Sequence, residues 1–249
     1  FPDLLTRHLL FEGTYQEDVI LAIQNLANKG DVVFDVGGHH GLMAVVTSRV
    51  VGSEGKVISF EPNPLARMEL EKNLKLNKAS NVHVVPLALS DAAGEVPFFA
   101  QQGTASWNSS LFNHFIGEGY TVKELKVSAD TMDAYVKRSG YAPKVIKIDM
   151  EGSEFLVLKG ARETIRLHRP ALIMEFNPDA ARAARTTIGA MVQWLQDLNY
   201  RLFVLRRNRC GRYRFRRQEP FEESKHCRDD LANVICIPTQ ASDWINATV

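Results

Sequence analysis

Stretches typical of buried strands and of amphipathic helices alternate along most of the chain. Residues 32–36 form an apolar run of the kind that is buried on both faces of a sheet, and a helix pattern follows from residue 42 to about 51. This alternation predicts βαβ units and a parallel sheet. Further strands are expected at 56–60, 82–89, 144–149, 171–175, 200–205 and 231–237, with a short extra strand at 95–100. Further helices are expected at 64–77, 128–138, 153–167 with a break near residue 160, and 187–198.

The pattern predicts one doubly wound α/β domain with helices on both faces of a mostly parallel sheet. The 249 residues show no internal repeat and no low-complexity linker, and α/β folds often use this length for a single domain. We expect residues 1–30 to form a helical segment packed on the sheet and residues 31–249 to form the main domain. An arginine-rich hairpin is expected as an insertion at 206–230, between the last two strands.

Composition excludes several classes of protein. The 30 basic and 29 acidic side chains give a formal charge of +1, which argues against a protein that coats nucleic acid through its overall charge. The cysteines Cys210, Cys227 and Cys236 are too few and too irregularly spaced for a disulfide framework or a CxxC metal site. No apolar run approaches the roughly 18 residues that span a bilayer, and the first residues do not resemble a signal peptide. We therefore expect a cytoplasmic protein without a transmembrane segment.

A glycine-rich turn follows the first predicted strand, at Gly37, Gly38 and Gly41. Ligands of open α/β sheets bind at the carboxyl ends of the strands, and glycines there allow close approach and present backbone N–H groups. Glu61 ends the second strand, about 20 residues further on, where a carboxylate can accept both hydroxyls of a ribose. We interpret the pair as a nucleoside-cofactor site. The alternatives are an ordinary turn and a glutamate that complements a helix N-terminus.

Acidic residues at the predicted strand ends favour S-adenosylmethionine over NAD or ATP. A pyrophosphate would meet like charges there, whereas S-adenosylmethionine carries a sulfonium and an ammonium and has no phosphate. In addition, Val36 breaks the GxGxxG pattern of dinucleotide-binding turns. The acidic residues are Asp35, Glu61, Asp91, Asp149, Glu151 and Glu175, with Glu154 one turn further on.

The segment that follows the strand expected to end at Asp149 offers candidates for catalysis. Asp149 and Glu151 leave the strand at alternate positions and Glu154 lies on the first helical turn, so all three can face one cleft. One of them could act as general base on a hydroxyl, or Asp149 and Glu151 could bind a divalent cation such as Mg²⁺. Alternatively, Glu151 and Glu154 complement the following helix N-terminus. His39 and His40 are rival bases, although loop histidines are more often surface or capping groups.

Taken in order, these segments resemble the FkbM family of S-adenosylmethionine-dependent methyltransferases. The matching pieces are 33–41, 58–64, 88–91 with Gly94, 127–133, 146–161 and 170–175. The resemblance covers roughly residues 13–203. It implies a seven-stranded, Rossmann-like class I methyltransferase fold with an antiparallel last strand. For the implied cofactor site we predict Asp35, Gly37, Gly38, His39, Gly41, Glu61, Pro62, Asn63, Leu89, Ser90 and Asp91.

The resemblance also implies a role for each part of the site. The glycine turn would hold the methionine portion of the cofactor, Glu61 the ribose, and residues 89–91 would flank the adenine. Asp149 and Glu151 lie where family members place an acidic motif that faces the acceptor, and Glu154 completes the predicted catalytic set. Family members of known activity mostly methylate hydroxyls of sugars or natural products.

We therefore predict an O-methyltransferase that moves a methyl group to a hydroxyl of a sugar, glycan or natural product by in-line displacement. A carboxylate base or metal-assisted deprotonation would remove the hydroxyl proton. The alternatives are an N-methyltransferase of protein or nucleic acid, docked by the basic hairpin, and a non-catalytic nucleoside-cofactor-binding module. A dehydrogenase is the weakest alternative.

Two segments outside that site could contact a substrate or a partner. Residues 101–120 form a long predicted loop, and loops of this length are often functional lids. We predict a substrate lid there rather than a spacer, at Ser106, Trp107, Asn108 and Ser109. The stretch from Arg206 to Arg217 is basic with interleaved aromatic residues, so it could bind RNA, phosphates or an anionic membrane surface. A solvated hairpin, offset by nearby acidic residues, is the favoured interpretation.

Overall fold

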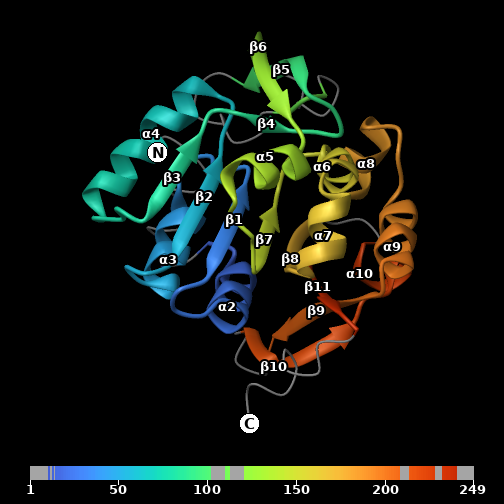
Figure 1. Cartoon of the computed structure of the whole chain (residues 1–249). Helices are drawn as coiled ribbons and strands as arrows, with labels where there is room; N and C mark the ends of the chain where they lie inside the picture. Colours follow the sequence, from blue (N-terminus) through green and yellow to red (C-terminus); the bar gives the residue numbers. More distant parts are fainter. Residues whose placement is uncertain are drawn as a thin grey trace.

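The computed structural model describes residues 15–101, 110–112, 121–207, 213–227 and 232–239, together with Phe11 and Gly13. The strands of its large sheet are β1 (Val32–Val36), β2 (Lys56–Phe60), β3 (Val82–Val85), β7 (Val145–Ile148), β8 (Ala171–Phe176), β9 (Tyr200–Arg207), β10 (Tyr213–Pro220) and β11 (Ala232–Pro238). The order across the sheet is β10-β9-β11-β8-β7-β1-β2-β3 (Figure 1). The five strands from β8 to β3 pair in parallel, and β11 runs antiparallel to both of its neighbours. The predicted parallel sheet with an antiparallel last strand is therefore confirmed.

Successive residues of the central strands point to opposite faces of the sheet, and this alternation builds two cores. Phe34 and Ile58 are fully buried in one core, and Val33 and Val57 are buried in the other. The first core is covered by α5 (Met132–Ser139), α6 (Glu154–Gly160), α7 (Arg162–His168), α8 (Pro178–Ala183) and α9 (Ile188–Asp197). The second is covered by α2 (Glu17–Leu26), α3 (Leu42–Val51) and α4 (Pro64–Leu76). Helices thus lie on both faces of the sheet, as the sequence predicts.

Side-chain caps explain where several helices begin. The side chain of Asn63 accepts a hydrogen bond from the Leu65 N–H at 3.0 Å, so α4 starts with its first turn closed. Thr131 caps α5 in the same way through the Ala134 N–H at 3.1 Å. Thr187 caps α9. These caps fix the ends of helices whose first turns lie near the carboxyl ends of the strands.

A second, three-stranded sheet lies beside this edge, at the top of Figure 1. It consists of β4 (Ala88–Leu89), β5 (Gly94–Gln101) and β6 (Val122–Asp130), in the order β4-β6-β5. The expectation of one strand over 82–89 is wrong, because Pro86 has no N–H for a strand ladder and separates β3 from β4. The expected helix start at 128–130 is also wrong, because those residues end β6, where Val127 and Ala129 are buried and Ser128 between them is exposed.

The predicted number of seven strands in the main sheet is wrong as well. The sheet has an eighth strand because the arginine-rich stretch folds back as β10 and pairs antiparallel with β9. The hairpin is held by Glu219, which forms ion pairs with Arg206 and with Lys225 at 3.2 Å and whose carboxylate lies 2.8 Å from Nε2 of His226. Lys225 and His226 lie on the short helix α10 (Glu223–His226). Glu219 therefore balances part of the positive charge of the hairpin.

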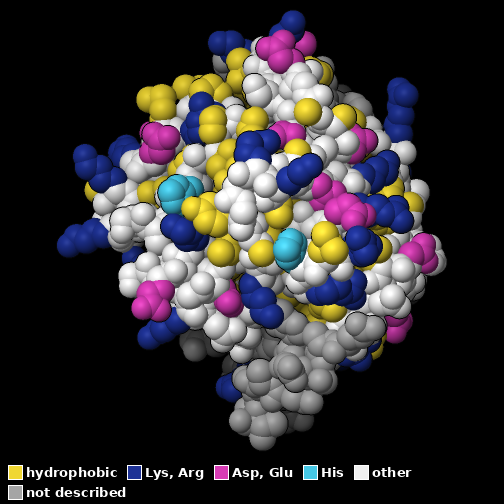
Figure 2. All heavy atoms as spheres, viewed as in Figure 1, with side chains coloured by type: hydrophobic (Ala, Val, Ile, Leu, Met, Phe, Trp, Pro, Cys, Tyr) yellow, Lys and Arg dark blue, Asp and Glu magenta, His cyan; other side chains and the backbone are white. Residues whose placement is uncertain are grey.

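The outer surface is of mixed character on the face that Figure 2 shows. Basic and acidic side chains alternate over it, and hydrophobic side chains gather at the upper left, where Figure 1 places α4. Leu65, Met68 and Leu76 of that helix are each more than 60% exposed. In the second core beneath this surface, the helix α2 packs on the sheet through its buried Val19 and Ile23. No helix within the described ranges combines the length and the apolar character that a membrane span needs.

Candidate active site

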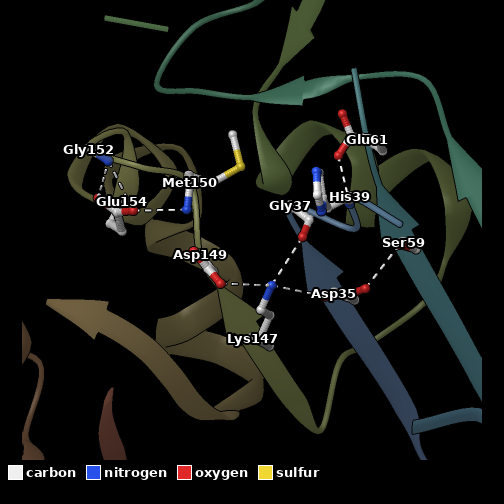
Figure 3. Close-up of polar contacts among 10 residues, drawn as sticks. All are labelled: Asp35, Gly37, His39, Ser59, Glu61, Lys147, Asp149, Met150, Gly152 and Glu154. Carbon is white, nitrogen blue, oxygen red and sulfur yellow. Dashed lines mark hydrogen bonds and ion pairs between the residues drawn. The ribbon is translucent and has the colours of Figure 1, made fainter. Parts of the chain in front are cut away.

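The predicted site residues meet at the carboxyl ends of β1, β2 and β7. The chain leaves β1 toward α3 on one face of the sheet and leaves β7 toward α6 on the other, so the two connections diverge between these adjacent strands. Ligands of doubly wound sheets bind at such a point. The close-up in Figure 3 shows the residues gathered there.

The glycine turn packs directly against the end of β7. Gly37 has φ +82°, and a Cβ on it would lie 2.0 Å from the carbonyl oxygen of Asp149. A Cβ on Gly38 would lie 2.1 Å from the hydroxyl of Ser59. No side chain fits at either distance, so glycine is required for the turn to approach the two neighbouring strands. The predicted cofactor turn and the predicted catalytic strand end are therefore in contact.

Glu61 is buried beside this turn. Its Oε2 accepts a hydrogen bond from the backbone N–H of His39 at 2.8 Å (Figure 3). Its Oε1 accepts one from the backbone N–H of Asn63 at 2.8 Å. Burial raises the pKa of Glu61 to about 7, although these two hydrogen bonds and the nearby Arg67 oppose the rise. Each carboxylate oxygen has a second lone pair, so the side chain can still accept two hydroxyl groups.

A row of buried polar side chains crosses three strands below the turn. The strand register places Ser59, Asp35 and Lys147 side by side on β2, β1 and β7. The ammonium of Lys147 lies 3.5 Å from Asp35 Oδ1 and 3.5 Å from Asp149 Oδ2, and it donates a hydrogen bond to the Gly37 carbonyl at 3.1 Å (Figure 3). The Ser59 hydroxyl donates to Asp35 Oδ2 at 3.1 Å. One buried cation thus joins the predicted cofactor turn to the predicted catalytic strand end.

The charges in this row affect one another strongly. Burial raises the pKa of Asp35 above its ordinary value even though Lys147 and Ser59 lower it. Burial disfavours the charge of Lys147, but the carboxylates of Asp149 and Asp35 outweigh it, so its pKa is raised. The sequence prediction did not include Lys147. A lysine inside a strand that is otherwise buried was the signal that could have identified it.

A cluster of three carboxylates lies next to this row. Oxygen atoms of Asp149, Glu151 and Glu175 all lie within 4.8 Å of one another. Burial and mutual repulsion raise the pKa of both Glu151 and Glu175 well above the ordinary value. Glu175 was expected on the acidic rim but was not among the predicted catalytic residues. The parallel pairing of β7 with β8 places it beside Asp149. Such a cluster can hold a proton, accept hydroxyl hydrogen bonds or bind a cation.

Glu154 faces a different set of partners. Its carboxylate accepts hydrogen bonds from the N–H of Met150 at 2.9 Å and from that of Gly152 at 3.1 Å (Figure 3). Burial raises the pKa of Glu154 to about 7, although these hydrogen bonds lower it. The side chain therefore holds the turn between β7 and α6 in place.

The remaining predicted residues lie around the same edge. Leu89 is fully buried in the core, and Ser90 is buried at the end of β4, where it donates to Asp91 at 3.3 Å. Asp91 is exposed. The rings of His39 and His40 lie against each other at a tilt of 33°, with their centroids 3.8 Å apart. Pro62 is buried beside Glu61. The predicted lid residues Ser106, Trp107, Asn108 and Ser109 lie outside the described residues.

Comparisons with known proteins agree with this arrangement. The family model described as "Methyltransferase FkbM domain" matches residues 35–202. The chain is 30% identical to the hexuronic acid methyltransferase AglP of Haloferax volcanii over 159 residues, which are 61% of this chain and 58% of that protein. It is 28% identical to methyltransferase sdnD of Sordaria araneosa over 191 residues, 64% of this chain and 71% of the relative. The chain thus spans somewhat more than half the length of AglP.

A solved structure extends the comparison to the fold. The crystal structure of methyltransferase FkbM from Methylobacillus flagellatus KT superposes with a TM-score of 0.53 at 18% identity, over 85% of this chain and 44% of that chain. At this identity the likeness concerns the fold alone. It confirms the Rossmann-like class I methyltransferase fold predicted from the sequence, here with one additional strand.

Proposed function

Because the chain belongs to the FkbM family of S-adenosylmethionine-dependent methyltransferases, we propose that it is an O-methyltransferase acting on a hydroxyl of a sugar, glycan or natural product. The name of its relative AglP, a hexuronic acid methyltransferase, supports a carbohydrate acceptor. The observation that carries the proposal is the position of Asp149. Its backbone touches the cofactor turn at Gly37, and its carboxylate belongs to the cluster with Glu151 and Glu175.

The residues at the strand ends fit S-adenosylmethionine. Glu61 offers two carboxylate oxygens to the ribose hydroxyls, and the acidic surroundings suit a ligand with a sulfonium and an ammonium. Gly37, Gly38 and Gly41 would border the methionine portion, and Ser90 and Asp91 the adenine. When bound, the cofactor supplies an already activated methyl group. The chain therefore has to orient the acceptor, exclude water and remove a proton.

Asp149 is our candidate for the base. Its side chain is 21% exposed, so it can reach both an acceptor and solvent, whereas Asp35 is almost fully buried. Asp149 Oδ2 would take the proton from the acceptor hydroxyl as the methyl group is transferred. Lys147 lies 3.5 Å from this oxygen and balances its negative charge before the transfer. Glu151 and Glu175 would accept hydrogen bonds from neighbouring acceptor hydroxyls.

Metal-assisted deprotonation is the alternative route at the same residues. The oxygens of Asp149, Glu151 and Glu175 lie within 4.8 Å of one another, and carboxylate oxygens are the ligands that Mg²⁺ takes. A bound cation would lower the pKa of a coordinated hydroxyl, so no side chain would need to act as base. Turnover measured with Mg²⁺ and with a chelator separates the two routes, because only metal-assisted deprotonation stops when the ion is removed.

Two measurements test the proposal. Calorimetric titration with S-adenosylhomocysteine, with NADH as a control, should show binding of the first ligand alone. Asp149→Asn should bind S-adenosylhomocysteine as before but lose about 10²- to 10⁴-fold in turnover, the usual effect of removing a general base. Turnover is counted as tritium moved from labelled cofactor to a panel of methyl hexosides and methyl hexuronosides.

Asp197→Asn is the matched control, since Asp197 is an exposed aspartate on α9. It should leave both the affinity and the turnover unchanged. Equal turnover of Asp149→Asn and the unchanged chain would remove Asp149 as base or metal ligand.

A further inference from the structure

Ser110 is buried at the small sheet, although it belongs to none of the predicted site residues. It is only 1% exposed. Its carbonyl accepts a hydrogen bond from the Phe99 N–H at 2.8 Å, and its own N–H donates to the Phe99 carbonyl at 3.1 Å. This antiparallel bridge attaches Ser110 to β5, and the adjacent Leu111 packs against the core of the small sheet. The backbone of Ser110 is therefore fixed.

The side chain of Ser110 extends from this fixed backbone to the turn after β7. Its hydroxyl donates a hydrogen bond to the carbonyl oxygen of Glu151 at 2.7 Å. The same hydroxyl accepts one from the N–H of Phe112 at 3.1 Å. Because the hydroxyl both donates and accepts, its direction is determined. The small sheet and the acidic turn are thus joined by one buried hydrogen bond.

Glu151 has a backbone conformation that needs such support. Its φ is +49°, in the left-handed region that is unfavourable for any residue with a Cβ, and Gly152 follows with φ +106°. On the amide side of the turn, the Glu154 carboxylate holds the N–H groups of Met150 and Gly152. On the carbonyl side, Ser110 holds Glu151. The turn is therefore clamped from two directions.

The conformation of Glu151 decides where its carboxylate points. With this left-handed φ, its side chain lies in the cluster with Asp149 and Glu175, where oxygens of the three carboxylates come within 4.8 Å of one another despite their mutual repulsion. Without the hydrogen bond from Ser110 to the Glu151 carbonyl, the turn can relax toward ordinary φ values. The carboxylate of Glu151 would then move away from the other two. The placement of Glu151 thus depends on a residue 41 positions away in the chain.

We propose that Ser110 is a positioning residue for methyl transfer, which holds the Glu151 turn so that its carboxylate faces the acceptor together with Asp149. The proposal rests on the function proposed above, and it adds a residue that acts through Glu151 and touches neither cofactor nor methyl group. Loss of the Ser110 hydroxyl should therefore disturb use of the acceptor and leave the cofactor site intact.

The test compares Ser110→Ala with Ser48→Ala in the full chain. Ser48 is also buried, and its hydroxyl donates to Asn81, which precedes β3 at the amino ends of the strands, so its variant controls for the loss of a buried hydrogen bond. With the best acceptor of the methyl hexoside and methyl hexuronoside panel, Ser110→Ala should lower kcat/KM about 10- to 100-fold, the effect of a small misplacement. Its affinity for S-adenosylhomocysteine should stay unchanged. Ser48→Ala should leave both unchanged.

A double-mutant cycle asks whether Ser110 acts through Glu151. In a Glu151→Gln background, Ser110→Ala should cause little further loss of kcat/KM, because the carboxylate that it positions is already gone. An undiminished loss in that background would overturn the proposal. So would a Ser110→Ala variant with the kcat/KM of the unchanged chain.

Hydrogen exchange keeps the test independent of the acceptor. Ser110→Ala should speed exchange of the Met150 and Gly152 amides, which the clamped turn protects, whereas Ser48→Ala should not. If the unchanged chain methylates no member of the panel, the proposed function fails on that panel. Faster exchange at the turn would still support the role of Ser110 in holding Glu151, and unchanged exchange would overturn it.

Discussion

Replacing Lys147 by methionine tests the buried charge row most directly. The substitution keeps a long, unbranched side chain but removes the ammonium that lies 3.5 Å from both Asp35 and Asp149. It also removes the hydrogen bond to the Gly37 carbonyl at 3.1 Å. Because Asp35 is almost fully buried, its carboxylate cannot turn to water instead. We therefore expect a large loss of stability and not a local adjustment.

The size of the loss follows from distance and burial. At 3.5 Å each carboxylate gains about 5 kcal/mol from the ammonium if the effective dielectric constant is about 20, and desolvation offsets much of it. Removing one partner of a buried ion pair typically destabilises a protein by about 3–5 kcal/mol. We expect Lys147→Met to fall in that range, which is a large part of the stability of an ordinary domain.

The assay is urea unfolding followed by circular dichroism, with Lys72→Met as the matched control. Lys72 lies 3.4 Å from Glu69, as close as the buried pairs, but its side chain is 65% exposed against 7% for Lys147. Its loss should lower the free energy of unfolding by less than about 1 kcal/mol. Asp35→Asn should recover part of the stability when it is combined with Lys147→Met. Equal small losses for the two lysine variants would refute the reasoning.

Two further predictions concern the cofactor turn. Since burial raises the pKa of Glu61 to about 7, the carboxylate gains a proton as the pH falls through that value and loses acceptor capacity for ribose hydroxyls. The Kd for S-adenosylhomocysteine should therefore rise about tenfold from pH 8 to pH 6. Glu61→Gln should abolish this pH dependence. Calorimetry that shows the same Kd at both pH values would contradict the prediction. Gly37→Ala should prevent folding or cost more than about 3 kcal/mol in guanidinium unfolding, because its Cβ would meet the Asp149 carbonyl. Gly30→Ala, at φ +87° with open space, should cost only about 1–2 kcal/mol, and equal losses would be evidence against the close approach.

Local pattern was sufficient to predict the parallel strands of the large sheet and to place the glycine turn, Glu61 and Asp149 at one edge of it. The buried strands around Asp35 and Asp149 have continuous apolar patterns, and the glycine turn and Glu61 follow directly at their ends, so residues distant in the chain could be assigned to one edge. Of the small sheet, the strand expected at 95–100 is confirmed as β5, but β6 was missed for a physical reason. Strand β6 alternates like a half-buried strand, but Ser128 to Asp130 also resemble a helix cap, and only tertiary pairing with β5 decides between them.

Contacts between individual side chains could not be predicted from the sequence. The sequence allows Glu154 to face the acceptor, but its carboxylate accepts hydrogen bonds from two backbone N–H groups of its own turn. Glu175 joins Asp149 only because β8 pairs with β7 in a particular register. Ser110 reaches Glu151 across 41 residues through a bridge to β5, which no local pattern encodes. Each of these contacts depends on the packing of elements that are far apart in the chain.

The additional strand β10 has a consequence for how copies of the chain meet. It ends the order of the described strands, so one row of its backbone N–H and C=O groups faces outward. Such rows can pair with the same edge of another molecule and begin aggregation. The strand carries the exposed Arg214 and ends in Pro220, features that discourage strand addition through charge repulsion and a missing N–H. A basic side chain on this strand therefore protects the edge of the sheet without contact to nucleic acid or membrane.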